Sequence, residues 1–362
     1  MILGKYSKVS STNLRTRSFA AGYVFKFFSE NSGLAWNPGL LDAPRVISPG
    51  AVIISVLPVY LLILGGAFLR KSGILKSEHD DGIMRVIYNA MFPCFILDKI
   101  LGQDVLRSGS VVAWGMGLGF LLPLTGIAIG WAVGRLAGLQ KGTGARTFAI
   151  SAGIQNFGFT AIPVVQILWG SSAIALLFVH NIGVEVAIWT VGVMIMSGDR
   201  GFTLKRLLNG PVIAVVIGLL LVALGLDDKI TGPTREAMSM LGIGTFPLAI
   251  LITGASMADL VASERPSLKM IAASVVVRII LSPIVLLAAA KFLPIPVELR
   301  QILVVQAAMP AAMSTVLLAR LYGGRPAIAV QVIIVTTIVS IGSLPWIITW
   351  GCQWVGIKPL LP

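Results

Sequence analysis

An apolar run from about residue 146 to 168 is interrupted at its centre by SAGIQNFGFTAIP, residues 151–163. A second run, from about 300 to 319, is interrupted by QAAMPAAMS, residues 306–314. Proline lacks an amide donor and blocks a carbonyl of the preceding turn. In hydrocarbon, such freed backbone groups are tolerated only where they face protein or a water-filled cavity. We therefore expect two broken helices whose ends point into a protein interior.

The composition of the chain is that of a membrane protein. Of 362 residues, 56% are hydrophobic and 12% are charged, whereas soluble domains carry about 25% charged residues. A membrane-spanning helix needs roughly 20 apolar residues. Runs of that kind predict an all-α integral membrane protein with ten transmembrane helices, spans one to ten, at about 50–69, 82–102, 110–134, 146–168, 173–197, 210–226, 237–258, 268–290, 300–319 and 327–350.

Basic residues in the loops predict the orientation of the spans. The formal net charge of +13 would suggest a nucleic-acid partner in a soluble protein, but here it is a topology signal, and no nucleic acid is expected. Cytoplasmic loops carry the excess of Lys and Arg. The loops after the odd-numbered spans hold thirteen basic residues and the opposite loops with the C-terminal tail hold seven. Both ends of the ten-helix core are therefore predicted to face outward from the cell (inner) membrane.

The polar and basic segment 1–48 reads as an N-terminal appendage. Its basic residues disagree with an outward N-terminus. Either translation begins near Val46 or Val52, or the segment is a re-entrant tail or an interfacial helix.

An internal repeat relates the two halves of the chain. Residues 91–97 (MFPCFIL) align with 245–251 (TFPLAIL), and 170–175 (GSSAIA) with 324–329 (GRPAIA), both at a shift of 154 residues. The halves, 49–200 and 206–353, each hold five spans, and since five is odd, the second copy must be inverted in the membrane. Inverted repeats with interrupted helices are typical of secondary transporters, whose binding sites lie near the membrane midplane.

The two interruptions provide the candidate substrate-binding residues. Uncharged polar side chains and half-helix ends can hold a ligand there without a charge in the membrane, the amino ends favouring an anion. The predicted substrate-binding residues are Gln155, Asn156, Gly158 and Pro163 in span four and Gln306, Met309, Pro310 and Ser314 in span nine.

Two ionisable residues lie in span five. A charge inside a span is costly and marks a functional hypothesis. Glu185 is the first candidate for proton coupling, and a structural ion pair with Arg278 of span eight is the alternative. His180 is the second candidate, with a packing role as its alternative.

The sequence offers no catalytic or metal constellation. Cys94 and Cys352 form neither a disulfide framework nor a zinc spacing. The chain has none of the phosphate-loop, His-Glu-x-x-His or Gly-x-Ser-x-Gly motifs. No enzyme activity, metal or cofactor is expected.

Five short motifs in order resemble the bacterial branch of the auxin efflux carrier family, within the bile, arsenite and riboflavin transporter superfamily. They are 89–93 (NAMFP), 155–163 (QNFGFTAIP), 246–259 (FPLAILITGASMAD), 309–314 (MPAAMS) and 340–345 (SIGSLP). The resemblance covers about 50 to 350. It implies that spans one, two, six and seven form a scaffold and that the other six move, with crossed, broken helices four and nine around the ligand. It also implies small organic-anion substrates such as malonate or malate, and frequent homodimers.

We therefore expect a secondary active transporter of the efflux-carrier type that moves small carboxylates by alternating access. A sodium-coupled symporter of the bile-acid type and a transporter-derived membrane sensor are the alternatives. Span three lacks the acidic residue that the resemblance to plant members would require for proton linkage, which leaves the coupling ion open.

Overall fold

The computed structural model describes residues 49–139, 143–158, 160–198, 210–263 and 267–358. The predicted appendage, 1–48, lies outside the described residues. The expected all-helical membrane class is confirmed. Six helical stretches are long and apolar enough to cross a bilayer, and they lie within α2 (Pro49–Lys71), α5 (Gly109–Leu136), α8 (Ser171–Ala187) with η6 (Ile188–Gly192) and α9 (Val193–Ser197), α11 (Pro233–Ser263), α12 (Leu268–Val275) with η9 (Val276–Leu281) and α13 (Ser282–Phe292), and α16 (Pro326–Val355).

The other four predicted spans fall on charged, short or broken helices. Span two is the continuous helix formed by α3 (Asp80–Val86), the π-helical turn η4 (Ile87–Met91) and α4 (Phe92–Ile100), with charged residues near both ends. Span six is the short helix α10 (Gly210–Ala223). Spans four and nine are each divided in two, as the sequence predicts: α6 (Thr143–Gly153) and α7 (Ala161–Trp169), then α14 (Val297–Ala308) and α15 (Ser314–Leu321).

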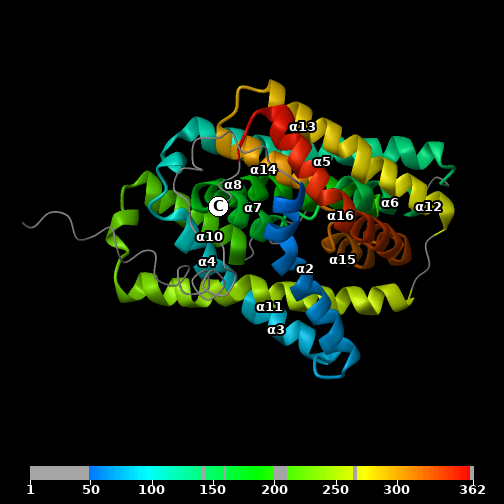
Figure 1. The fold of residues 1–362 in the computed structure, drawn as a ribbon, viewed down its shortest axis with the longest axis horizontal. Helices are drawn as coiled ribbons and strands as arrows, with labels where there is room; N and C mark the ends of the chain where they lie inside the picture. Colours follow the sequence, from blue (N-terminus) through cyan, green and yellow to red (C-terminus); the bar gives the residue numbers. More distant parts are fainter. Residues whose placement is uncertain (1–48, 140–142, 159, 199–209, 264–266, 359–362) are drawn as a thin grey trace, which may run out of the picture. The chain divides into compact units, whose positions relative to one another are not determined.

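The helices pack as two groups. We call α2, α3, α4, α10 and α11 the frame group, in which α2 and α4 contact α11 and α10 contacts α4 (Figure 1). We call α5 to α9 and α12 to α16 the crossover group, in which α5 contacts α6 and α8, and α16 contacts α6, α12 and α14. The groups meet where α4 contacts α8 and where α2 contacts α7 and α16.

Ion pairs join the ends of the frame helices. Arg70 at the end of α2 contacts both Asp80 of α3 and Asp259 of α11, the latter at 3.0 Å. Arg235 of α11 donates to Asp98 of α4 at 2.8 Å. These pairs link helix ends that adjoin loops, where charged side chains are tolerated.

Glycines bring α5 within backbone contact of α6 and α8. A Cβ atom added to Gly126 would lie 2.2 Å from the carbonyl oxygen of Gly153 in α6, and one added to Gly119 would lie 1.9 Å from that of His180 in α8. Small residues at a helix interface permit such close approach in membranes. The crossover group is therefore tightly packed beside the break in span four.

Candidate functional site

The two broken helices cross at their interruptions. Gln155 and Ala311 form an isolated antiparallel β-bridge. The amide of Asn156 donates to the carbonyl oxygen of Pro310 at 2.7 Å, and the amide of Ala312 donates to that of Ile154 at 3.0 Å. Each unwound segment thus satisfies backbone groups of the other, as buried non-helical backbone requires.

Side chains stabilise the crossing from both sides. The amide of Ala311 donates to Thr336 Oγ1 in α16 at 3.1 Å. Asn156 Nδ2 donates to Thr160 Oγ1, at the start of α7, at 3.0 Å. Thr336 of α16 and Thr160 at the start of α7 thus each hold one of the two unwound segments.

A buried polar network lies at the crossing. Gln155 Nε2 donates to Gln306 Oε1 at 2.8 Å, and His180 Nε2 lies 3.1 Å from the same oxygen. His180 Nδ1 lies 3.2 Å from the carbonyl oxygen of Gly115 in α5. Gln155, Gln306 and His180 expose at most 1% of their surface. The network joins α5, α8 and both broken helices.

Arg278 lies in the π-helical turn η9, between α12 and α13 of the crossover group, and is fully buried. Its Nε donates to the carbonyl oxygen of Met309 at 3.1 Å. Glu185 instead accepts a hydrogen bond from Trp189 Nε1 at 2.6 Å. Among the described residues no ion pair joins Glu185 to Arg278, so the ion-pair alternative for these two residues is wrong.

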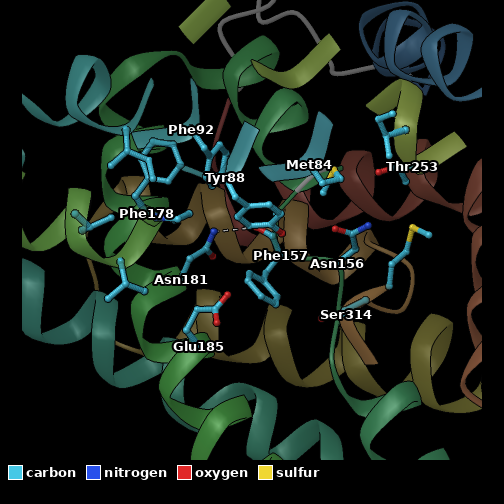
Figure 2. A pocket seen from close by; sticks show the side chains of 18 of the residues that line it. Met84, Tyr88, Phe92, Asn156, Phe157, Phe178, Asn181, Glu185, Thr253 and Ser314 are labelled. Carbon is cyan, nitrogen blue, oxygen red and sulfur yellow. Dashed lines mark hydrogen bonds between the residues drawn. The ribbon is translucent and has the colours of Figure 1, made fainter. Parts of the chain in front are cut away.

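A cavity of about 540 Å³ lies between the two groups. The crossover group contributes the unwound residues 156–158 and 312–313, the first residue of α15 and part of α8, while the frame group contributes residues of α3 to α4, α10 and α11. Figure 2 shows Asn156 and Ser314 on one side of the cavity, Asn181 and Glu185 on the other, and Phe157 between them.

The lining of the cavity is apolar and aromatic with a few polar groups. Its aromatic residues are Tyr88, Phe92, Phe157 and Phe178, and Phe92 packs edge to face on Phe178 with ring centroids 6.1 Å apart. Polar side chains are those of Asn156, Asn181, Thr253, Ser256 and Ser314, and the charged ones in the described lining are all acidic: Asp80, Asp81 and Glu185.

The structure places some of the predicted site residues at the cavity and others away from it. Asn156, Gly158, Ser314 and Glu185 line the cavity. Asn156 also lines a smaller space of about 100 Å³ together with Pro310. The buried network contains Gln155, Gln306 and His180. Met309 provides a backbone carbonyl that accepts a hydrogen bond from Arg278. Pro163 is buried in the first turn of α7, where a missing amide donor is tolerated. Neither of the two spaces has any of these last five residues in its lining.

Asn181 is one of the polar cavity residues that the sequence did not lead us to expect. Its Nδ2 donates to the carbonyl oxygen of Phe157 at 3.0 Å, while its buried Oδ1 has no hydrogen-bond partner among the described residues. Its position in span five, between the ionisable residues His180 and Glu185, could have marked it as a candidate. The aromatic residues of the lining gave no such signal, because aromatic residues are common in membrane helices.

Comparison with known proteins identifies similar chains. A family model described as "Membrane transport protein" matches residues 51–203 and 199–348. An uncharacterized transporter of Methanothermobacter thermautotrophicus is 25% identical over 305 residues, which cover 80% of this chain and 95% of the relative. An uncharacterized transporter of Methanocaldococcus jannaschii is 25% identical over 306 residues, which cover 82% of this chain and 96% of the relative.

Proposed function

Because the chain belongs to the membrane transport protein family, the family of the auxin efflux carriers, we propose that it is a secondary active transporter for organic acids that works by alternating access. This membership confirms the family resemblance of the sequence motifs and points to a transporter rather than an enzyme.

The observation that carries the proposal is the place of the cavity. It lies between two helix groups, and the crossing of the two broken helices forms one of its walls. Secondary transporters bind substrate where interrupted helices meet at the interface of their moving parts. Movement of the crossover group along the frame group would expose the same residues first to one side of the membrane and then to the other.

The arrangement of the helices supports ten spans in two inverted repeats. The breaks at Gln155 and Pro310 fall at equivalent places of the two halves, and the two unwound segments pair in antiparallel orientation. The frame and crossover groups contain the same spans as the scaffold and moving parts that the family resemblance implies. Spans two, four, six and nine would then also cross the membrane.

The lining favours an acid with an apolar body. A volume of about 540 Å³ falls within the range of about 300–1,000 Å³ typical of pockets for drug-sized ligands, so a compact dicarboxylate would leave much of the cavity unfilled. Asn156, Ser314 and the amino end of α15 would hold the carboxylate. The unpartnered Asn181 Oδ1 would accept a hydrogen bond from a donor group of the substrate.

Glu185 supports proton coupling. Two negative charges in one cavity of low dielectric repel strongly, and no basic side chain belongs to the described lining. An anionic substrate would therefore enter together with a proton on Glu185. Glu185 would be protonated while the substrate is bound and ionised while the cavity is empty. A cavity residue that alternates between a protonated and an ionised form meets the requirement for a coupled proton carrier.

The cavity is proposed to face the cytoplasm. Its lining includes Asp80 and Asp81 at the start of α3 and Pro211 at the start of α10. These helix ends adjoin the loops after spans one and five, which belong to the set with the basic excess, and such loops are cytoplasmic. Both ends of the ten-helix core would then lie on the outer side of the cell membrane.

Uptake into proteoliposomes tests the proposal. The purified protein is challenged with aliphatic and aromatic mono- and dicarboxylic acids, with and without an imposed pH gradient. We expect saturable uptake of one class of acid, driven by the pH gradient, and a half-saturation concentration raised about tenfold or more in Asn156→Ala, since hydrogen bonds to charged groups are among the strongest.

The matched control is Asn89→Ala, which removes the same side chain from an exposed position outside the cavity. Wild-type kinetics in Asn156→Ala would show that the site lies elsewhere. No uptake of any acid, together with no thermal stabilisation of the protein by the same acids, would refute the organic-acid carrier.

A further inference from the structure

Arg278 contacts the carboxyl ends of both helices that break at the crossing. Its Nε donates to Met309, its Nη2 to Gln306 at 3.4 Å and its Nη1 to Gly153 at 3.5 Å, in each case to the backbone carbonyl oxygen. Gly153 is the last residue of α6, and Gln306 and Met309 lie at the end of α14. One guanidinium thus serves both half-helices.

These contacts explain how the charge is tolerated. The guanidinium stays protonated in proteins, and a buried charge without compensation is very costly. None of the ion pairs among the described residues includes Arg278, although Arg70, Arg107 and Arg235 all form them. The compensation comes from the two helix ends, because each helix carboxyl end carries about half a negative charge, so that two ends balance one cation.

Half-helix carboxyl ends and unwound carbonyls are the groups with which transporters coordinate a transported cation. In this chain a side chain occupies that position. We propose that Arg278 is a built-in cation that positions the two broken helices, so that the crossing assembles without a dissolved metal ion and transport does not require sodium. This inference rests on the proposed transport function and adds to it the identity of the charge at the crossing.

The local structure places Arg278 in a fixed position. The residue lies in a π-helical turn that contacts α5, α6 and α16, and such turns occur frequently at functional sites. The close contact of Gly126 with Gly153 fixes the end of α6 against α5. Arginine has several donors in a rigid fork, which allows a single side chain to reach three carbonyl groups from two helices.

The test separates charge from shape at this position. The variants are Arg278→Ala, Arg278→Met and Arg278→Lys, and the matched control is Arg300→Ala, which removes a half-buried guanidinium that also donates to a carbonyl, that of Ile295. Each protein is assayed for acid uptake and for its thermal unfolding midpoint, in sodium and in choline buffers, and with millimolar guanidinium chloride or urea. Urea is the neutral counterpart of guanidinium with a similar planar shape.

We expect wild-type uptake and unfolding to be the same in sodium and in choline. Arg278→Met and Arg278→Ala should lower uptake about tenfold or more and lower the unfolding midpoint, since they remove charge-assisted hydrogen bonds. Arg278→Lys should have an uptake rate and an unfolding midpoint between those of these two variants and those of the wild type. Guanidinium, but not urea, should raise the midpoint and the uptake of Arg278→Ala and leave Arg300→Ala unchanged.

Three results would overturn the inference: a wild-type protein that needs sodium for uptake, an Arg278→Met variant as stable as Arg278→Lys, or equal rescue of Arg278→Ala by urea and guanidinium. If neither solute rescues Arg278→Ala, the comparison of the Met and Lys variants decides. If the wild type transports no acid, the proposed function fails, while the unfolding midpoints still show whether a cation is required at the crossing.

Discussion

The substitution Gly126→Ala tests whether the close contact of α5 with α6 maintains the crossing. A Cβ atom at this position would lie 2.2 Å from the Gly153 carbonyl oxygen, whereas ordinary contact begins at 3.4 Å. Backbone cannot rotate away as a flexible side chain can, so α5 and α6 must separate by about 1.2 Å, the difference between these two distances.

That separation should affect both stability and transport. Overpacking of a well-packed interior costs about 1–3 kcal/mol. The displaced carbonyl belongs to Gly153, which is also a partner of Arg278, and a misplacement of about 1 Å in a functional site can lower a rate about 100-fold. We expect Gly126→Ala to lose about 1–3 kcal/mol of unfolding free energy and to transport at least about tenfold more slowly.

The matched control is Gly117→Ala in the same helix, where an added Cβ has no neighbour within 4 Å. Both substitutions gain the helix propensity of alanine, up to about 1 kcal/mol, so their difference isolates the clash. Denaturant or thermal unfolding in detergent and uptake into proteoliposomes provide the two readouts. Equal stability and equal uptake for the two variants would refute the close-packing argument.

Three further substitutions test the cavity and the crossing. Glu185→Gln should abolish uptake driven by a pH gradient and preserve substrate exchange at equal pH, with the exposed Glu236→Gln as the control, and persistent pH-driven uptake would contradict proton coupling by this residue. Thr336→Val should cost about 1–3 kcal/mol in denaturant unfolding because it leaves the buried amide of Ala311 without its acceptor, and an unchanged midpoint would argue against that role. Phe178→Ala should destabilise the protein by about 3–5 kcal/mol and weaken binding of aromatic acids more than of aliphatic ones, as measured by thermal stabilisation, and equal losses would contradict an aromatic contact.

The positions of the helices could be predicted from the sequence because hydrophobic length carries that information. The two broken helices were also predictable, since Pro310 and the glycines around Asn156 interrupt otherwise apolar runs. Hydrophobic length alone does not identify every predicted span. Six helical stretches meet a strict criterion of length and apolarity. The short helix at 210–223 and the helix at 80–100, whose ends are charged, do not, and their assignment as spans depends on the repeat between the two halves of the chain.

The partners of polar side chains could not be predicted in the same way. Gln155 and Asn156 are adjacent in the sequence, yet one lies in the buried network and the other lines the cavity. An unwound segment has no helical period, so spacing does not reveal which way each residue faces. The alternative ion pair of Glu185 with Arg278 is not found for a related reason. A buried arginine can be balanced by the backbone carbonyls of helix ends, and no particular residue type marks these in a sequence.

The charge state of Glu185 would determine how transport responds to voltage. Arg278 belongs to the protein and moves out and back with the crossover group, so its charge does no net electrical work over a complete cycle. With substrate bound, a monocarboxylate contributes one negative charge and a protonated Glu185 none, whereas in the empty return step Glu185 contributes the single negative charge. The loaded and the empty carrier would thus move the same charge in opposite directions, so that no net charge crosses the membrane in a cycle. Each elementary charge that did cross at 100 mV would contribute about 2.3 kcal/mol. A monocarboxylate would therefore follow the pH gradient alone, and a dicarboxylate carried with one proton would also respond to the membrane potential.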